Sequence, residues 1–276
     1  MKRLLALMIV VALTALVISC TKKAEEEPDH AEPEPQTAGA DTMMLRVVDG
    51  AADGMLVLAG KAAGEVYKLP LDGLTLYLDG GSVDASEIED GMSAEVWYTG
   101  GVQETFPMRF EDVVAVSFSR ESSGVYDLCG LYLQVLADLW DRDEGLNGGT
   151  ELVSVDLSKA PGGLTAGEKA AIAYVFAQKH GVQGLTMTFD ELREEGYLTG
   201  EKLEGGGTAY SFTDGLLFTI TPDESTEGES FSLPVVCFSA EKWRSPLGAY
   251  CLGACQAVCT EDGRWNGYSI GVEAIS

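Results

Sequence analysis

Residues 165–181 read TAGEKAAIAYVFAQKHG, and this stretch carries the clearest secondary-structure signal in the chain. Thr165 followed by Glu168 forms an S/T-x-x-E capping box, which marks the start of a helix. The run Lys-His-Gly at 179–181 marks the end, since cations favour the last turn and glycine favours the position after it. The stretch therefore predicts a helix with both ends defined.

The segments around this helix predict a domain in which helices precede strands. GVYDLCGLYLQVLADLWDRDEG, residues 124–145, spaces its large apolar residues like a helix, and TFDELREEGYL predicts a short helix over 190–195. Later runs such as LLFTITP, FSLPVVCFSA and GAYCLGACQAVCT indicate strands. We therefore expect an α+β domain over residues 122–276, with helices packed on an antiparallel sheet.

Residues 43–120 show a different pattern, of short alternating runs separated by Gly or Asp-Gly. Such runs predict a small antiparallel β-barrel domain over residues 42–121. Within it, EIEDGMSAEVWYTGGVQETFPMRF, residues 87–110, resembles an uncharacterised OB-like barrel domain found in lipoproteins of Gram-positive bacteria. The resemblance implies a fold but no activity. The whole chain is then α+β in class.

The N-terminus has the features of a secretory signal peptide. Two basic residues, Lys2 and Arg3, precede an uncharged run from Leu4 to Ile18. This run is shorter than the ~20 apolar residues that a membrane-spanning helix needs. A charged start followed by a short apolar core is typical of a cleaved leader.

The residues that follow this core resemble the lipobox of bacterial lipoproteins. They are Val17, Ile18, Ser19 and Cys20. The resemblance implies cleavage by a type II signal peptidase between Ser19 and Cys20, which removes residues 1–19, and attachment of a diacylglyceryl group to the Cys20 sulfur. Two acyl chains, at about 0.8 kcal/mol per buried CH₂, suffice for stable anchoring. The alternative is an ordinary signal peptide with an accidental cysteine.

The composition of residues 20–41 and the net charge of the chain indicate which classes of partner and which location to expect. After Cys20 this segment is rich in acids and proline and has no aliphatic residue larger than Ala, so we expect a disordered tether. The full chain has a net charge of −26, and nucleic acid is therefore a poor partner. We expect the protein at the outer face of the cytoplasmic membrane, or at the outer membrane of a cell that has one, held through lipid at Cys20.

The cysteines beyond Cys20 raise the question of a metal site. Their number is odd, so at least one thiol is free of an internal disulfide. Cys251, Cys255 and Cys259 are spaced four residues apart. In a strand such residues are separated by about 13 Å, which is too far for them to bind one metal ion or to form a disulfide. A disulfide such as Cys237–Cys251 across adjacent strands, which would leave Cys129, Cys255 and Cys259 unpaired, and a metal site are the alternatives to simple packing. We expect one small face packed under a helix, formed by Ala249, Cys251, Gly253, Cys255, Ala257 and Cys259.

Other motifs give no catalytic or metal-binding residue. DRDEGLNGGTE, residues 141–151, resembles a calcium loop through Asp141 and Asp143, but its glycine and closing acid are each one place early, and a polar loop is favoured. No G-x-S-x-G motif occurs, and the histidines are His30 in the tether and His180 at a helix end. We assign no catalytic residue, metal or cofactor.

Four aromatic or cationic residues are candidates for ligand binding. Trp243 and Arg244 stand beside a Ser-Pro turn, and both residue types are enriched in binding hot spots. The alternative is that Trp243 packs on the domain edge while Arg244 pairs with an acid. Tyr77 and Trp97 are expected on the outer face of the barrel, where OB-type barrels bind ligands, or at the contact between the domains.

These observations favour a membrane-anchored, non-catalytic binding or interaction module over an enzyme. Its partner would be an envelope protein or a small-molecule ligand. The alternatives are an envelope hydrolase that uses two carboxylates and a structural component of an envelope complex. The sequence identifies neither the ligand nor the oligomeric state.

Overall fold

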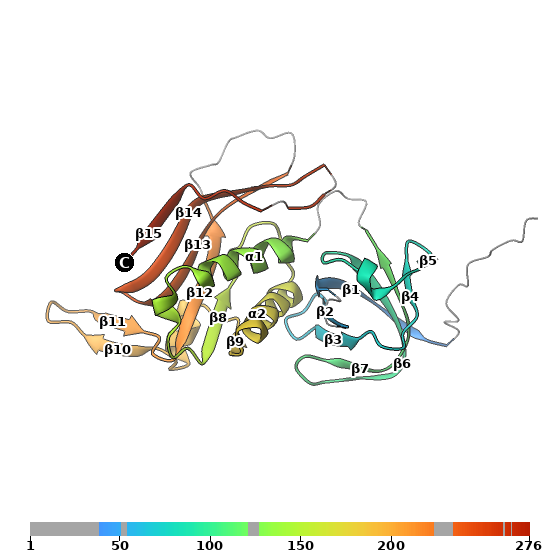
Figure 1. Cartoon of the computed structure of the whole chain (residues 1–276). Helices are drawn as coiled ribbons and strands as arrows, with labels where there is room; N and C mark the ends of the chain where they lie inside the picture. The colour runs from blue at the N-terminus through green and yellow to red at the C-terminus, as the bar shows by residue number, and fades with distance from the viewer. Residues whose placement is uncertain (1–38, 51–53, 121–126, 224–233, 262, 266) are drawn as a thin grey trace, which may run out of the picture. The chain divides into compact units, whose positions relative to one another are not determined.

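The helix predicted at residues 165–181 is present in the computed structural model as α2, Ala166–His180 (Figure 1). Its capping box forms, because the Thr165 hydroxyl oxygen accepts a hydrogen bond from the Glu168 backbone N–H at 3.1 Å. Gly181 ends the helix with a φ of 66°, in the left-handed region that suits glycine. Both predicted ends are confirmed.

The structure describes most of the chain beyond the N-terminal region. Strands dominate it and helices are few. The predicted leader, Cys20 and nearly all of the tether lie outside the described residues, and no described helix has the length and apolar character to cross a membrane. All described residues belong to one unit, Glu32–Ser276. They are 39–50, 54–120, 127–223, 234–261, 263–265 and 267–276.

The first sheet has seven strands in the order β3-β2-β1-β6-β7-β4-β5 and curls into a half-barrel. The strands expected over residues 43–120 are therefore present. Hydrogen bonds between β3 and the residue before β7 draw the two sides of the sheet together, since Met108 N donates to Val66 O at 2.7 Å. The strands are β1 (Asp41–Asp49), β2 (Met55–Ala59), β3 (Val66–Pro70), β4 (Leu76–Leu78), β5 (Gly81–Ser82), β6 (Ser93–Gln103) and β7 (Arg109–Ser119).

The second sheet has six strands in the order β15-β14-β13-β12-β8-β9. It is mixed, so the expectation of an antiparallel sheet is wrong for β8, which runs parallel to both β12 and β9. The connection through α2 explains the parallel pairing with β9, because a helical crossover returns the chain parallel to its starting strand. The strands are β8 (Leu152–Asp156), β9 (Gln183–Leu185), β12 (Gly215–Pro222), β13 (Val235–Ser245), β14 (Gly248–Val258) and β15 (Val272–Ile275).

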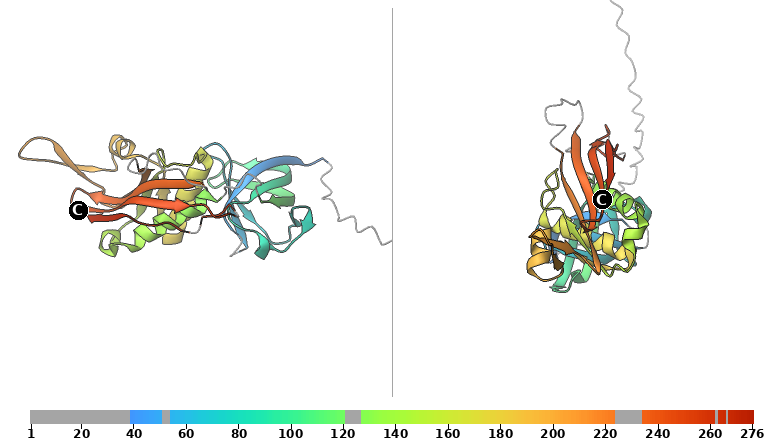
Figure 2. Two further views of the ribbon diagram at one scale, coloured as in Figure 1. Left: turned by 90° about the horizontal axis from the view of Figure 1, so that it is seen from above. Right: turned by 90° about the vertical axis from the view of Figure 1, so that its left-hand side faces the viewer.

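Two further helices and a hairpin complete the second part of the chain. Helix α1, Leu128–Asp141, packs with α2 against one face of the six-stranded sheet. Helix α3, Phe189–Glu194, is the short helix expected near residues 190–195. The hairpin of β10 (Thr199–Lys202) and β11 (Thr208–Ser211) forms a separate two-stranded sheet that extends away from the larger one (Figure 2).

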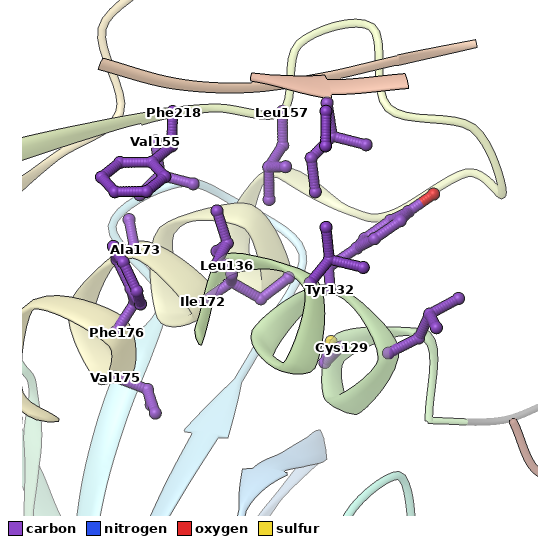
Figure 3. Close-up of a cluster of buried hydrophobic side chains, with 14 of the residues drawn as sticks. Cys129, Tyr132, Leu136, Val155, Leu157, Ile172, Ala173, Val175, Phe176 and Phe218 are labelled. Carbon is purple, nitrogen blue, oxygen red and sulfur yellow. The ribbon is translucent and has the colours of Figure 1, made fainter. Parts of the chain in front are cut away.

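The main core lies between the helices and the six-stranded sheet (Figure 3). Ile172 and Phe176 of α2 point toward Val155 and Phe218 of the strands, with Leu136 of α1 beside them, and each is at most 1% exposed. Complete burial of one such side chain contributes about 1.5–3 kcal/mol. The i, i+4 spacing of the two α2 residues explains why the helix presents them on one face.

Helix α2 also contacts the curled sheet through its N-terminus. Gly167 is buried in the first turn, and a Cβ there would lie 2.4 Å from the Gly60 carbonyl oxygen. The Thr165 hydroxyl donates to that same oxygen at 3.0 Å. The Arg46 guanidinium of β1 lies 3.5 Å from a carboxylate oxygen of Glu168. The absence of a side chain at Gly167 therefore permits the close approach.

A β-bulge in β14 overturns the prediction of one small face. Phe238 of β13 pairs with Cys255 and Ala240 pairs with Leu252, so two residues of β14 stand where one would keep the alternation. Ala254 in the bulge has a φ of 49°. One extra residue inverts the faces that follow it. Leu252 and Cys255 therefore both face the helices, whereas Cys251 lines a hollow on the opposite face.

Candidate functional site

A groove with a mainly apolar lining runs between α2 and β9. Its volume is about 430 Å³, within the 300–1,000 Å³ typical of ligand sites. Helix α2 forms one wall and the segment Val182–Met187 forms the other. Ala63 from the turn after β2 and Phe106 from the turn after β6 close one end.

Small residues create the space in this groove. Ala170, Ala173 and Ala177 recur at i, i+3 and i+7, which places them on one side of α2. Gly184 lies opposite, and a Cβ at that position would be 2.9 Å from the Ala173 carbonyl oxygen. β9 therefore approaches the helix closely, and the Gly184 position lies against the Ala173 backbone and the Ala177 methyl group.

Two aromatic rings mark the end of the groove that lies near the curled sheet. The rings of Phe106 and Tyr174 meet edge to face with centroids 5.9 Å apart. Phe106 is 59% exposed. Partial burial raises the pKa of the Tyr174 hydroxyl, and the nearby Arg109 opposes this shift. The tyrosine is thus a neutral hydrogen-bonding group at ordinary pH.

The groove is also electrically neutral. None of its described lining residues carries a charged side chain, although the whole chain has 44 acidic and 18 basic residues. Its polar lining groups are amide, hydroxyl and backbone groups, such as those of Gln178, Gln183 and Thr186. This lining suits an uncharged ligand with hydrogen-bonding groups, and it offers no partner for an ionic one.

Trp243 and Arg244 lie away from this groove, in contacts within the chain. Arg244 donates hydrogen bonds to the carbonyl oxygens of Leu146 at 2.6 Å and of Gly148 at 2.7 Å. The ring of Trp243 meets that of Phe189 at 5.2 Å, edge to face. The guanidinium thus holds a loop and the indole packs beside α3, so the structure does not bring these two residues to an open binding surface.

Tyr77 and Trp97 are not brought together with the groove either. Tyr77 is 6% exposed, so its ring is not open to a ligand. Leu76 and Leu78 on either side of it pack in the core of the curled sheet, so the alternation along β4 directs Tyr77 to the opposite face. Trp97 is half-buried on β6 and pairs across the ladder with Thr42 and Ala115.

The loop at residues 141–151 surrounds the buried ammonium of a lysine, which the sequence analysis did not predict. The ammonium of Lys242, a residue with 0% exposure, donates to the carbonyl oxygens of Trp140, Arg142 and Asp143. Burial lowers the pKa of this ammonium to about 8, and nearby acids of the loop, Asp143 first, oppose the shift. The carbonyl oxygens that bind this ammonium belong to the backbone and are not the carboxylates of Asp141 and Asp143 on which the resemblance to a calcium loop rested.

The described cysteines and His180 form no cluster that indicates a reactive centre. Within the described ranges no disulfide forms, and no cluster of His, Cys, Asp or Glu could hold a metal. Burial and the adjacent Glu241 raise the pKa of the Cys251 thiol to about 11, which disfavours the nucleophilic thiolate. His180 stacks on Trp140 with ring centroids 4.0 Å apart, consistent with a structural role at the helix end.

Two acids near the junction of the curled sheet and α1 titrate abnormally. Burial raises the pKa of Asp127 to about 7 and that of Asp90 to about 6. Asp127 is the N-cap of α1 and accepts a hydrogen bond from Gly130 N at 2.9 Å. The two carboxyl groups line different hollows, Asp127 with Arg46 and Asp90 with Asp49. The pair therefore does not face a shared space for a substrate.

Comparison of this chain with protein families, with curated proteins and with solved structures finds no match. The site therefore rests on geometry. The sequence analysis missed the groove, although two signals existed: alanines at helical spacing in α2 and the aromatic Phe106 before a proline. Neither signal identifies a groove until the edge strand and the helix are placed side by side.

Proposed function

We propose that this protein is a lipid-anchored, extracytoplasmic binding module that captures its partner in the groove between α2 and β9. The observation that supports the proposal is the combination of an uncharged apolar channel with an exposed aromatic ring, Phe106, on a strongly acidic chain. A concave, mainly apolar lining with a few polar groups is typical of ligand sites. We also propose that the curled sheet is OB-like and that the second part of the chain is an α+β domain.

The anchor belongs to the same proposal and rests on the sequence. Val17-Ile18-Ser19-Cys20 resembles a lipobox, and a tether rich in acid and proline follows it. Diacylation of Cys20 would hold the module at the outer face of the cytoplasmic membrane. Fractionation of cells that express the wild type or Cys20→Ser tests this part: the wild type is expected with membranes and the variant in the soluble fraction. Equal distribution of the two proteins would contradict the anchor.

A photo-crosslinking residue at position 106 tests the groove. In intact cells we expect it to form an adduct with an envelope partner, and we expect Ala170→Leu to abolish the adduct by filling the channel. Ala166→Leu is the matched control, since Ala166 is exposed on the same helix and does not line the groove. An adduct that survives Ala170→Leu, or one formed equally from position 247 at the exposed turn after β13, would contradict a groove-based role.

The second candidate function is that of a hydrolase that uses two carboxylates. The raised pKa values of Asp90 and Asp127 favour it. The N-cap role of Asp127 and the separate hollows of the two acids weigh against it. The double variant Asp90→Asn/Asp127→Asn separates the proposals. It should leave crosslinking from position 106 intact if the protein is a binding module.

A further inference from the structure

β9 is an edge strand whose outer side faces the groove. It ends the six-stranded sheet and pairs with β8 alone, in parallel register, with Gly184 opposite Val153. The Gln183 backbone N–H donates to the Glu151 carbonyl oxygen at 2.9 Å, so Gln183 directs its backbone groups toward β8. Because these directions alternate along a strand, the N–H and C=O of Gly184 point to the outer side.

This outer side offers backbone hydrogen bonds beside side-chain space. Thr186 follows in the same alternation as Gly184, is exposed and also lines the groove. An edge with open backbone groups is a template for another strand. The wall across the channel is formed by residues of α2, Ala170, Tyr174 and Gln178 among them. An added strand could therefore pair with β9 while alternate side chains enter the channel against α2.

The neutral lining narrows the chemistry of the occupant. No described side chain in the groove can pair with a charge, and the many acids elsewhere on the chain would repel an anionic segment. A backbone is itself uncharged and carries the donors and acceptors that Gly184 and Thr186 require. A strand docked between an edge strand and a helix is a known mode of peptide recognition.

We propose that the groove binds an extended, uncharged polypeptide segment of a partner protein, which adds a strand to β9. This rests on the proposed binding function and specifies its ligand class. The segment would contact Gly184 and Thr186 through its backbone, place apolar side chains along the alanines of α2, and end against Phe106.

The test begins with a display library of uncharged linear octapeptides selected on the purified protein. A selected peptide is then titrated against variants by fluorescence anisotropy. Thr186→Pro removes an outward N–H, whereas Thr186→Val keeps it at similar size. We expect Thr186→Pro and Ala170→Leu to weaken binding at least ~10-fold, and Thr186→Val and Ala166→Leu to bind like the wild type. Circular dichroism and urea midpoints confirm that each variant is folded.

Two further measurements test strand addition without relying on Thr186→Pro. N-methylation of successive peptide residues should weaken binding at every second position, as strand pairing requires. Peptide should also slow amide hydrogen exchange at Gly184 and Thr186. If Ala170→Leu abolishes binding but N-methylation shows no alternating effect along the peptide, strand addition is wrong while the groove is still a binding site. A library without binders would also overturn it, and the crosslink from position 106 then decides the proposed function. Self-association abolished by Thr186→Pro, without peptide binding, would identify a second copy as the occupant instead.

Discussion

The side-chain nitrogen of Lys242 on β13 lies 3.1 Å from the amide oxygen of Asn147, in the loop that follows α1. The same Asn147 donates from its amide nitrogen to the Trp140 carbonyl oxygen at 2.8 Å. The loop and the buried ammonium therefore fix one another, because the lysine satisfies oxygens that the end of a helix leaves without partners.

Lys242→Met should destabilise the protein. The substitution keeps the aliphatic stem but leaves several loop oxygens without a donor, at a cost of about 3 kcal/mol or more. Urea denaturation measures the change. Lys159→Met, at an exposed lysine, is the control and should lie within about 0.5 kcal/mol of the wild type. A Lys242→Met variant as stable as this control would show that the loop does not depend on the ammonium.

Asp127 should make stability depend on pH near neutrality. Its pKa is about 7 in the folded protein against an ordinary 3.8, because burial disfavours the carboxylate and Asp90 adds repulsion, while Gly130 N–H and Arg46 oppose the shift. The folded state thus binds the proton more tightly, and its stabilising contribution is lost as pH rises from about 4 through 7. Asp127→Asn keeps an N-cap without the charge.

The stability gained by Asp127→Asn over the wild type should therefore be larger at pH 8 than at pH 5. The expected difference between the two pH values is about 1–3 kcal/mol. Urea titrations at both pH values measure it, and Asp90→Asn should show a smaller effect because its pKa is raised only to about 6. An effect of Asp127→Asn that is equal at both pH values would contradict the raised pKa.

Ala254→Gly should stabilise the bulge in β14. Ala254 has a φ of 49°, a conformation that costs an alanine about 1 kcal/mol and a glycine much less. We expect a net gain of about 0.5 kcal/mol in the free energy of unfolding. Ala257→Gly, at a fully buried site on the same strand, should instead destabilise. If both changes destabilise equally, the bulge is not strained at Ala254.

Gly167→Ala should destabilise the protein, although replacing a helical glycine by alanine usually stabilises. In an ordinary helix interior, replacing glycine by alanine stabilises by about 1 kcal/mol. Here the new Cβ would lie 2.4 Å from the Gly60 carbonyl oxygen, so we expect a loss of about 1–3 kcal/mol. Gly64→Ala, where a Cβ meets nothing within 4 Å, is the control. Thermal melting of the two variants gives the comparison.

The buried cysteines should resist alkylation in the native protein. Cys129, Cys255 and Cys259 are at most 2% exposed, and burial raises the pKa of the first two thiols. Mass spectrometry after alkylation without reductant should find these three unlabelled in buffer. In urea they should be labelled together with Cys237 and Cys251. Incomplete labelling in urea that reductant restores would reveal a disulfide.

Local signals in the sequence predicted the elements well. Helix α2 was predicted at both ends because Thr165, Glu168 and Gly181 act on backbone groups within one turn. The direction of β8 relative to its neighbours was missed, since the pairing of Val153 with Gly184 depends on how a crossover returns the chain and not on local pattern. Long-range register is a property of the assembled sheet.

The site was predicted less well, for the same reason. Trp243 and Arg244 have the residue types of a binding hot spot, yet Arg244 binds carbonyl oxygens more than 90 residues away in the chain. The bulge at Ala254 could not be read from the alternation of small residues, because a single extra residue leaves composition unchanged. The groove arises where Gly184 approaches Ala173, and no motif marks that contact.

The position of β1 in the curled sheet determines how the protein would respond to tension. β1 lies between β2 and β6, and its first residues, Asp41 to Arg46, pair with β6. A pull on the chain from its N-terminal side acts along this strand, whereas the ladder hydrogen bonds lie across it. The bonds therefore share the load in shear instead of opening one at a time, as they would in a peeled outer strand.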